Sequence, residues 1–258
     1  MWVTGASSGI GAGLARTLAT CRCKLILSGR NSEALKEVSD QCFKAGAEDT
    51  LILPFDVTDF DNLESITLQA VNWQGQIDVL LNNAGISQRS LIIDTQLSTY
   101  RKIMDVDFFG HVALTKCVLP HMIKAGGGHI AVTSSIAGKL GSKLRSGYSS
   151  AKHALDGFFE ALRAEHYDDG IRVSMLYPGY VHSNVAFNAI TGDGGLHGKR
   201  ESEHDQGITA DEAGRKIIKQ LGKEKEEIYV GSGSEMITPL LKRFVPSLLS
   251  WFLRKQKV

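Results

Sequence analysis

The sequence contains little cysteine, little proline and almost no net charge. Its four cysteines among 258 residues are too few for a disulfide framework. Cys21 and Cys23 lack the second pair of ligands that a zinc site needs, so we expect buried free thiols and no metal site. A net charge of +1 argues against a nucleic-acid partner, which would require a strongly basic surface.

The first residues of the chain do not form a signal peptide. Apolar residues make up 43% of the sequence, enough for a sizeable core. We therefore expect a reduced, intracellular and globular protein. Only three residues precede Thr4, fewer than the five or six that a buried strand usually has, so a targeting or anchoring segment could stand upstream of Met1.

Short apolar runs alternate with helical segments along the chain. We expect strands at residues 1–3, 24–27, 50–55, 77–81, 129–133, 171–176 and 227–230. Helices are expected at residues 10–20, 31–45, 59–73, 98–123, 147–168 and 209–222. This alternation predicts an α/β fold, a Rossmann-like doubly wound parallel sheet with helices on both faces. With no repeat or linker, residues 1–235 form a single domain, followed by an amphipathic C-terminal tail at 236–258.

A glycine-rich turn follows the first expected strand. From Thr4 to Gly11 the chain reads Thr-Gly-Ala-Ser-Ser-Gly-Ile-Gly and then enters an amphipathic helix. Glycines at such a turn let the backbone approach a pyrophosphate, and the helix N-terminus offers N–H groups to it. The residues expected to bind the cofactor here are Gly5, Ser7, Ser8, Gly9, Ile10 and Gly11.

Tyr148 and Lys152 lie four residues apart in an expected helix, so their side chains share one face. An ammonium group beside a phenol favours the phenolate, which suits proton exchange with a substrate oxygen. Ser135 follows the expected strand 129–133, where its hydroxyl could hold the same oxygen. A Tyr-x-x-x-Lys pair alone is common on helices; together with the glycine-rich turn it predicts carbonyl–alcohol redox chemistry.

In combination these motifs resemble the short-chain dehydrogenase/reductase family. The glycine-rich turn, Asn82-Asn83-Ala84-Gly85, Ser135, Tyr148 with Lys152, and Pro178-Gly179 follow that family's order across residues 1 to about 235. Within the family the chain most resembles the reductases called SDR family members 7 and 7B. Residues 85–90, 114–120, 178–184, 188–191 and the apolar tail carry that likeness.

The resemblance implies roles for individual residues. Lys152 would bind the nicotinamide ribose, Tyr148 would donate a proton, and Ser135 would orient the carbonyl while hydride passes from the cofactor. The other cofactor contacts that it implies are Asp56, Val57, Asn83, Ala84, Gly85, Pro178, Gly179, Val181 and Ser183.

Asp107 departs from the family's pattern. It stands where an asparagine usually helps hold a water near the lysine. An aspartate keeps the acceptor oxygens but loses the amide donors. We therefore expect an active site that includes Asp107 and works with an altered rate or pH dependence.

The residues after the second expected strand indicate the cofactor. Ser28-Gly29-Arg30-Asn31 contains no acid for the ribose 2′-OH of NAD, but it has a guanidinium that suits the 2′-phosphate of NADP. We therefore expect NADP(H), with Arg30 and Asn31 among its contacts. A solvated arginine at a helix start is the alternative. Ser8, where many NADP enzymes of the family carry a basic residue, adds no support.

Residues 184–207 interrupt the alternation with five glycines and few apolar residues. The segment is either a disordered surface loop or a lid over the substrate. We favour the lid, because the segment follows Pro178-Gly179 closely and long loops in compact domains are often functional.

The tail combines apolar residues at helical spacing with positive charge. Pro239, Pro246 and its internal charges exclude a transmembrane span, which needs about 20 apolar residues. An interfacial helix on anionic lipid fits this composition, and packing against the body or a partner subunit is the alternative. The apolar residues are Leu240, Leu241, Phe244, Val245, Leu248, Leu249, Phe252 and Leu253, and the cations are Lys242, Arg243, Arg254, Lys255 and Lys257.

These features predict an NADPH-dependent oxidoreductase that reduces a lipophilic carbonyl to an alcohol. Candidate substrates are an acyl- or alkyl-dihydroxyacetone phosphate, a steroid or a retinal-like aldehyde. We also expect peripheral membrane contact through the tail and assembly into a homo-oligomer. The alternative is a nucleotide-bound regulatory or scaffolding protein with little turnover, which only Asp107 favours.

Overall fold

A parallel sheet organises the protein. The computed structural model describes residues 1–199 and 207–255, and within them seven strands run in the order β3-β2-β1-β4-β5-β6-β7. The strands are β1 (Trp2–Thr4), β2 (Lys24–Ser28), β3 (Asp49–Ile52), β4 (Val79–Asn82), β5 (Gly128–Thr133), β6 (Ile171–Pro178) and β7 (Glu227–Val230). The order reverses between β1 and β4, where open α/β sheets bind ligands beyond the carboxyl ends of the strands.

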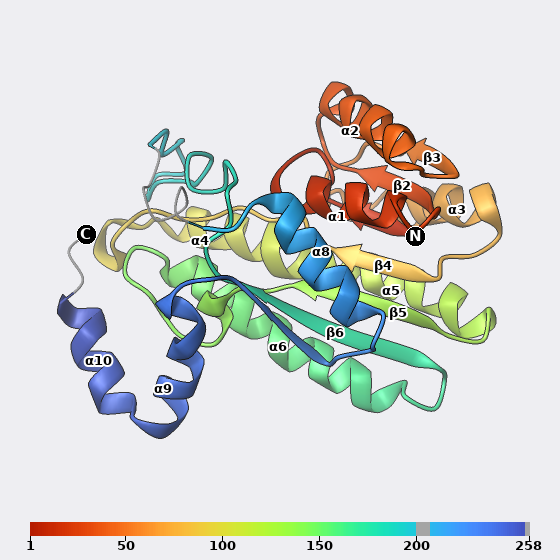
Figure 1. Cartoon of the computed structure of the whole chain (residues 1–258). Helices are drawn as coiled ribbons and strands as arrows, with labels where there is room; N and C mark the ends of the chain where they lie inside the picture. The colour runs from red at the N-terminus through yellow and green to blue at the C-terminus, as the bar shows by residue number, and fades with distance from the viewer. Residues whose placement is uncertain (200–206, 256–258) are drawn as a thin grey trace.

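Helices cover both faces of the sheet (Figure 1). The helices α1 (Gly9–Ala19), α2 (Ser32–Ala45) and α8 (Ala210–Leu221) cover one face. The helices α3 (Leu63–Gln74), α5 (Gly110–Lys124) and α6 (Ser146–Glu165) cover the other. Successive residues of a strand point to opposite faces of the sheet and pack into two hydrophobic cores. Trp2 is therefore buried under α3 and α5, whereas Val3 is buried under α1. The predicted fold class is confirmed.

The expected helix 98–123 is divided in the structure. It becomes α4 (Leu97–Met104), the π-helical segment η2 (Asp105–Phe109) and α5. The wider π turn changes which side chains face the sheet, and such segments are frequent at functional sites.

Most other expected elements differ from the structure by a few residues at their ends, and for two of them a local cause is visible. The helix predicted at 59–73 begins at Leu63, because Asp56 accepts hydrogen bonds from the N–H and hydroxyl of Thr58 and holds a turn. The strand predicted at 50–55 ends at Ile52, shortly before Pro54, which has no N–H to donate.

The α1 and α8 helices pack closely through two glycines. A Cβ atom on Gly13 would overlap the backbone of Ala210, and one on Gly214 would lie 2.5 Å from the carbonyl oxygen of Gly13. Residues without side chains are therefore needed at both positions, and α8 is held against the helix that follows the glycine-rich turn.

The tail forms two short helices beside the sheet (Figure 1). After the 3₁₀ turn η4 (Ser234–Ile237) come α9 (Thr238–Phe244) and α10 (Pro246–Lys255). The helical path breaks at Val245, because a residue before proline is disfavoured in the α conformation. In the part of the chain that the structure describes, no helix is both long and apolar enough to cross a membrane.

Candidate active site

A cavity of about 960 Å³ opens at the carboxyl ends of the central strands. It brings together most of the residues predicted for the site. Those in its wall are Gly5, Ser7, Ser8, Gly9, Ile10, Arg30, Asp56, Val57, Asn83, Ala84, Gly85, Ser135, Tyr148, Lys152, Pro178, Gly179, Val181 and Ser183. Gly11, Asn31 and Asp107 lie behind or beside this wall.

The glycine-rich turn is shaped by positive φ angles and close backbone packing. Gly5 and Gly9 have φ angles of 63° and 52°, which favour glycine. A Cβ atom on Gly11 would overlap the carbonyl oxygen of Gly5, so Gly11 serves packing within the turn. The Ser8 side chain makes no capping hydrogen bond at the N-terminus of α1, and Ser8, Gly9 and Ile10 of this helix start line the cavity. The cradle therefore fits a pyrophosphate.

Hydrogen bonds join the ends of the three central strands around Asn83. The backbone N–H of Asn83 donates to Oγ1 of Thr4 at 2.9 Å, and its Nδ2 donates to the carbonyl oxygen of Thr4 at 3.1 Å. The hydroxyl of Thr133 donates to Oδ1 of Asn83 at 3.1 Å. Asn83 thus fixes the floor of the cavity rather than serving only as a turn residue.

Arg30 and Asn31 have different surroundings. The Arg30 side chain is 73% exposed at the cavity rim, with its guanidinium 3.8 Å from a carboxylate oxygen of Asp56. Asn31 caps α2, because its Oδ1 accepts a hydrogen bond from the N–H of Ala34 at 3.1 Å. The structure therefore gives the Asn31 side chain a role at the helix end, outside the cavity wall.

Ser135, Tyr148 and Lys152 meet in the same wall of the cavity. The Lys152 side chain is buried, and its Nζ donates to the carbonyl oxygen of Thr133 at 3.0 Å. This Nζ lies 5.6 Å from the centre of the Tyr148 ring. The Oγ of Ser135 accepts a hydrogen bond from the N–H of Ala137 at 3.1 Å, which orients it at the start of a 3₁₀ turn.

Gln88 positions the helix that carries the tyrosine, and sequence reasoning missed it. Its side chain is fully buried, and Oε1 accepts hydrogen bonds from the N–H groups of Gly147 at 2.7 Å and Tyr148 at 3.4 Å. These are N–H groups of the first turn of α6, which have no partner within the helix. Gln88 therefore caps α6 from a loop 60 residues upstream of Tyr148.

Asp107 is fully buried in η2, behind the cavity wall. Its Oδ1 accepts a hydrogen bond from the N–H of Ile86 at 2.7 Å, whereas its Oδ2 has no partner among the described residues. Burial raises the pKa of Asp107 to about 6, opposed by the nearby Lys152 ammonium and by the Ile86 N–H. A Cβ atom on Gly85 would lie 3.1 Å from this Oδ1 and 3.5 Å from Nζ of Lys152, so both groups flank Gly85.

His111 is a second buried titratable group at the same place, and no motif in the sequence pointed to it. Its Nε2 lies 2.6 Å from the carbonyl oxygen of Ala84 and therefore carries the proton, leaving Nδ1 as an acceptor. Nδ1 has no partner in the part of the chain that is described. Burial, and then the Lys152 ammonium, lowers the pKa of His111 to about 3. The imidazole is neutral at physiological pH.

The outer end of the cavity is built from two segments of the C-terminal half. Residues 184–199 are tied to the body, since the N–H of Arg89 donates to the carbonyl oxygen of Ile190 and the N–H of Ile190 donates to that of Ser87, both at 2.9 Å. Asn184, Val185 and Leu196 of this segment line the cavity. Residues 200–206 of the predicted lid lie outside the described residues, and the lid stays a prediction.

The second segment is the tail. Glu235, Thr238 and Leu253 line the cavity, and sequence reasoning assigned no site role to any of them. Oε1 of Glu235 accepts hydrogen bonds from the backbone N–H groups of Gly233 at 3.2 Å and Tyr180 at 3.5 Å, which brings the start of the tail against the Pro178-Gly179 turn.

Comparison with protein-family models gives a match to short chain dehydrogenase over residues 1–192. The chain is 39% identical to dehydrogenase/reductase SDR family member 7B of Mus musculus, covering 95% of this chain and 74% of that protein. It is 37% identical to dehydrogenase/reductase SDR family member 7 of Homo sapiens, covering 99% of this chain and 76% of that protein.

Two solved structures share the fold. One is a short chain dehydrogenase/reductase from Burkholderia phymatum in complex with NAD, with a TM-score of 0.82, 21% identity and coverage of 96% and 93% of the two chains. The other is an alcohol dehydrogenase from Thermococcus sibiricus complexed with 5-hydroxy-NADP, with a TM-score of 0.76, 23% identity and coverage of 90% and 95%. At these identities the likeness concerns the fold alone.

Proposed function

The chain belongs to the short-chain dehydrogenase/reductase family, and on that premise we propose that it reduces a lipophilic carbonyl compound to an alcohol with NADPH. The observation that carries this proposal is the meeting of Ser135, Tyr148 and Lys152 in the wall of one cavity with the glycine-rich turn. A nicotinamide cofactor supplies the hydride when it is bound.

The residues of this chain supply the proton and hold the substrate oxygen. Tyr148 donates its phenolic proton to the oxygen that becomes the alcohol, and the hydroxyl of Ser135 hydrogen-bonds the same oxygen. The Lys152 ammonium is held by the carbonyl oxygen of Thr133, so its charge stays beside the phenol when the proton leaves. Gln88 fixes the N-terminus of α6 and with it the position of Tyr148.

The choice of NADP(H) rests on Arg30. Its guanidinium stands at the cavity rim beyond β2, and residues 28–31 contain no carboxylate for a ribose 2′-OH. The pairing of Arg30 with Asp56 is exposed and 3.8 Å long, so it is worth little and leaves the guanidinium available to a phosphate. The solved structures named above hold NAD in one case and an NADP derivative in the other, so they do not decide this point.

The outer end of the cavity supports a lipophilic substrate. Leu140, Leu144, Val185, Leu196 and Leu253 contribute apolar surface there. Two cations, Lys143 and Arg145, line the same end. Apolar surface beside cations favours the phosphate-bearing candidate, an acyl- or alkyl-dihydroxyacetone phosphate, over a steroid or a retinal-like aldehyde.

The test is NADPH oxidation with one member of each candidate class and with Tyr148→Phe as the control. We expect turnover with wild type, fastest with the phosphate-bearing ketone, and its loss in the control. NADPH binding without turnover on any of these substrates would favour the second candidate function, a nucleotide-bound regulatory or scaffolding protein, for which the buried Asp107 is the supporting observation.

A further inference from the structure

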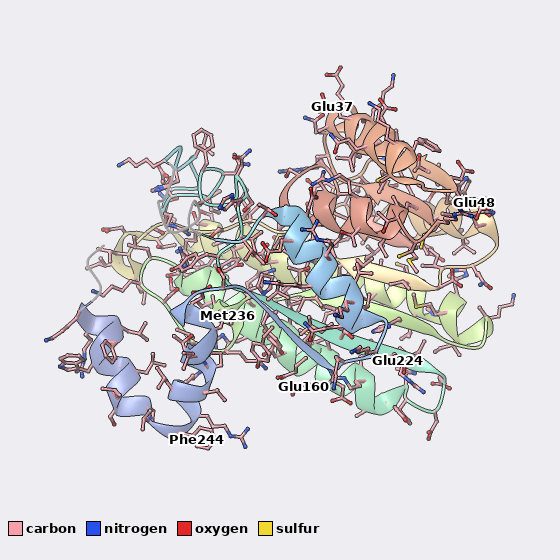
Figure 2. The ribbon with its side chains drawn as sticks, in the orientation of Figure 1. Glu37, Glu48, Glu160, Glu224, Met236 and Phe244 are labelled. Atoms are coloured by element: carbon pink, nitrogen blue, oxygen red, sulfur yellow. The ribbon has the colours of Figure 1, made fainter. Side chains whose placement is uncertain are left out.

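The outer face of α9 and α10, called here the tail hairpin (residues 238–255), is apolar and exposed. Figure 2 shows Phe244 at the turn between the two helices, far from the sheet, whereas Met236 lies against the body. Leu240, Phe244, Val245, Leu248, Trp251 and Phe252 are between 42% and 73% exposed. Side chains of this size gathered on one element mark an interaction surface.

The opposite face of the hairpin packs against the body. Leu249 is only 5% exposed, and Leu253 joins the core and the cavity wall. The Nζ of Lys143 donates to the carbonyl oxygen of Arg254 at 3.0 Å. The hairpin therefore has an inner face that closes the cavity and an outer face that the body does not cover.

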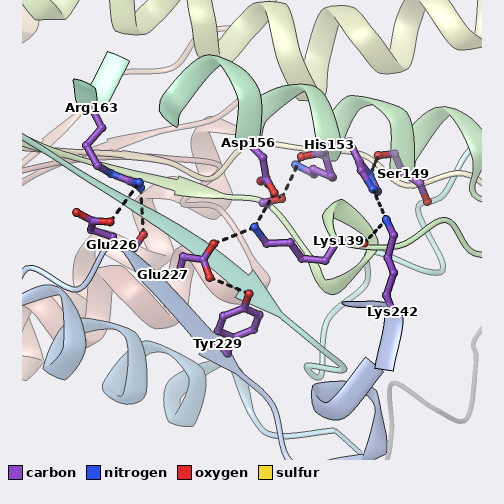
Figure 3. A network of polar contacts seen from close by, with 11 residues as sticks. Lys139, Ser149, His153, Asp156, Arg163, Glu226, Glu227, Tyr229 and Lys242 are labelled. Atoms are coloured by element: carbon purple, nitrogen blue, oxygen red, sulfur yellow. Dashed lines mark hydrogen bonds and ion pairs between the residues drawn. The ribbon is translucent and has the colours of Figure 1, made fainter. Parts of the chain in front are cut away.

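Figure 3 shows how α9 is fastened to α6 and its neighbours. The Nζ of Lys242 donates to the carbonyl oxygen of Lys139 at 2.6 Å and lies 3.5 Å from Nε2 of His153. Lys139 is itself fixed, because its Nζ pairs with Asp156 on α6 and Glu227 on β7, each at 2.9 Å. The hairpin is thus held against the body and forms part of the cavity wall.

The charge of the hairpin is of one sign. Residues 236–255 include four cations and no acid. Two of the cations stand beside exposed rings, with Nζ of Lys255 4.0 Å from the Trp251 ring centre and Cζ of Arg243 5.8 Å from that of Phe244. Aromatic rings beside cations are typical of helices that lie on a membrane surface. The rings enter the headgroup boundary, and the cations contact anionic headgroups.

We propose that the outer face of the tail hairpin docks on an anionic lipid surface, with the substrate end of the cavity held at that surface by the inner face. A second copy of this chain is a poorer occupant, because a two-fold interface would place cations opposite cations. The docking does not depend on the proposed reaction. Only its use, delivery of a lipophilic substrate from the bilayer to the cavity, rests on that proposal.

The first test is co-sedimentation of the full chain with vesicles of phosphatidylcholine alone or with added phosphatidylserine. We expect sedimentation with the anionic vesicles, weakened by salt and reduced about fivefold by Arg243→Gln. The double variant Trp251→Ser with Phe252→Ser should stay in the supernatant. The matched control is Ile92→Ser with Ile93→Ser, which alters residues 73% and 89% exposed outside the hairpin and should sediment like wild type.

A second measurement needs no turnover and locates the contact. Tryptophan emission should shift to shorter wavelength when anionic vesicles are added, and the shift should vanish in Trp251→Phe, which keeps an aromatic ring. The proposal is overturned if the full chain ignores both kinds of vesicle at low salt, or if the control variant loses binding as well. It is also overturned if Trp251→Ser with Phe252→Ser changes the mass of the particle in sedimentation equilibrium without affecting vesicle binding, because the face would then join subunits.

Discussion

Asp107 and His111 lie one helical turn apart beneath Lys152, and each has one buried polar atom without a partner among the described residues. Both atoms, Oδ2 and Nδ1, are acceptors when the carboxyl is ionised. The Lys152 ammonium favours ionisation of Asp107 and disfavours protonation of His111. The proposed catalytic lysine therefore lies near two titratable groups. The pKa of Asp107 is raised, whereas the pKa of His111 is lowered.

We expect Asp107→Asn to remove a transition near pH 6 from the pH dependence of kcat. With the carboxylate gone, no negative charge opposes the Lys152 ammonium, so the pH optimum should move down while the fold is kept. The measurement is kcat across pH 5–9 for both proteins, with circular dichroism as the check on folding. A folded but inactive variant would show that the site requires the acid.

The same substitution should change how stability depends on pH. The pKa of Asp107 rises from 3.8 to about 6 on folding, so its contribution to stability is full below pH 4 and falls by about 3 kcal/mol between pH 4 and 6. The lowered pKa of His111 acts in the opposite direction, because its contribution is lost as the pH falls from 6.5 towards 3.

In the wild-type protein the contributions of Asp107 and His111 to stability change in opposite directions between pH 4 and 6 and offset each other. In Asp107→Asn only the contribution of His111 still depends on pH. Relative to wild type, the variant should therefore gain stability as the pH rises from 4 to 6. Urea unfolding of both proteins at pH 4.5 and 6.5 measures this difference. A difference that does not change with pH would show that Asp107 does not titrate as described.

Tyr148→Phe should lower kcat by about 10²–10⁴-fold, because only the proton-donating oxygen is removed. Cofactor affinity should stay within about twofold, since the ring and Lys152 remain in place. Tyr167→Phe, at an exposed tyrosine just beyond α6, is the matched control and should behave like wild type. Retention of more than a tenth of kcat by Tyr148→Phe would exclude this residue as the acid.

Arg30→Ala should weaken NADPH binding by about 1.5–3 kcal/mol, the usual contribution of a hydrogen bond to a charged group, and leave NADH binding unchanged. Dissociation constants for both cofactors can be measured by fluorescence titration. Lys36→Ala, which removes an exposed cation of α2 outside the cavity wall, is the control. Equal losses for the two cofactors, or a wild-type preference for NADH, would contradict the assignment of NADP(H).

Two glycine-to-alanine substitutions in helices should change stability in opposite directions. Gly157→Ala in α6 meets no atom within 4 Å and should stabilise the protein by about 0.5–1 kcal/mol through helix propensity. Gly13→Ala in α1 would overlap the backbone of Ala210 and should cost about 1–3 kcal/mol or more. Thermal unfolding of both variants decides whether the contact between α1 and α8 is as close as described.

Much of the fold could be predicted from the sequence, because strand and helix order follows from local periodicity. Residues whose position depends on distant contacts could not be predicted. Gln88 caps α6 from a loop 60 residues upstream, and nothing beside it in the sequence indicates that contact. His111 comes within electrostatic reach of Lys152 in the folded protein, just after the π-helical segment η2, which the sequence predicts as part of one continuous helix.

The tail is a second region in which the position of residues depends on distant contacts. Its apolar residues predict helices, but the sequence does not show which of them the body covers, and within α10 they are divided between two sides. Leu249 and Leu253 face the body, whereas Leu248 and Phe252 face outward. The spacing that predicted the helices could not indicate how the two faces are divided, because that depends on how α10 packs against the body.

The cavity is lined by segments that lie far apart in the sequence and are therefore synthesised at different times. The glycine-rich turn, residues 5–11, is synthesised early, and Ser183 is the last of the predicted cofactor contacts to be made. Leu253, which also lines the cavity, is made only after the seven strands of the described structure. Because a domain generally folds as a unit, the cavity is enclosed only when its last helix is in place, whereas the predicted cofactor contacts all lie within residues 5–183. A nucleotide bound there would stabilise the folded domain by mass action, so cofactor supply would influence the yield of folded protein as well as its turnover.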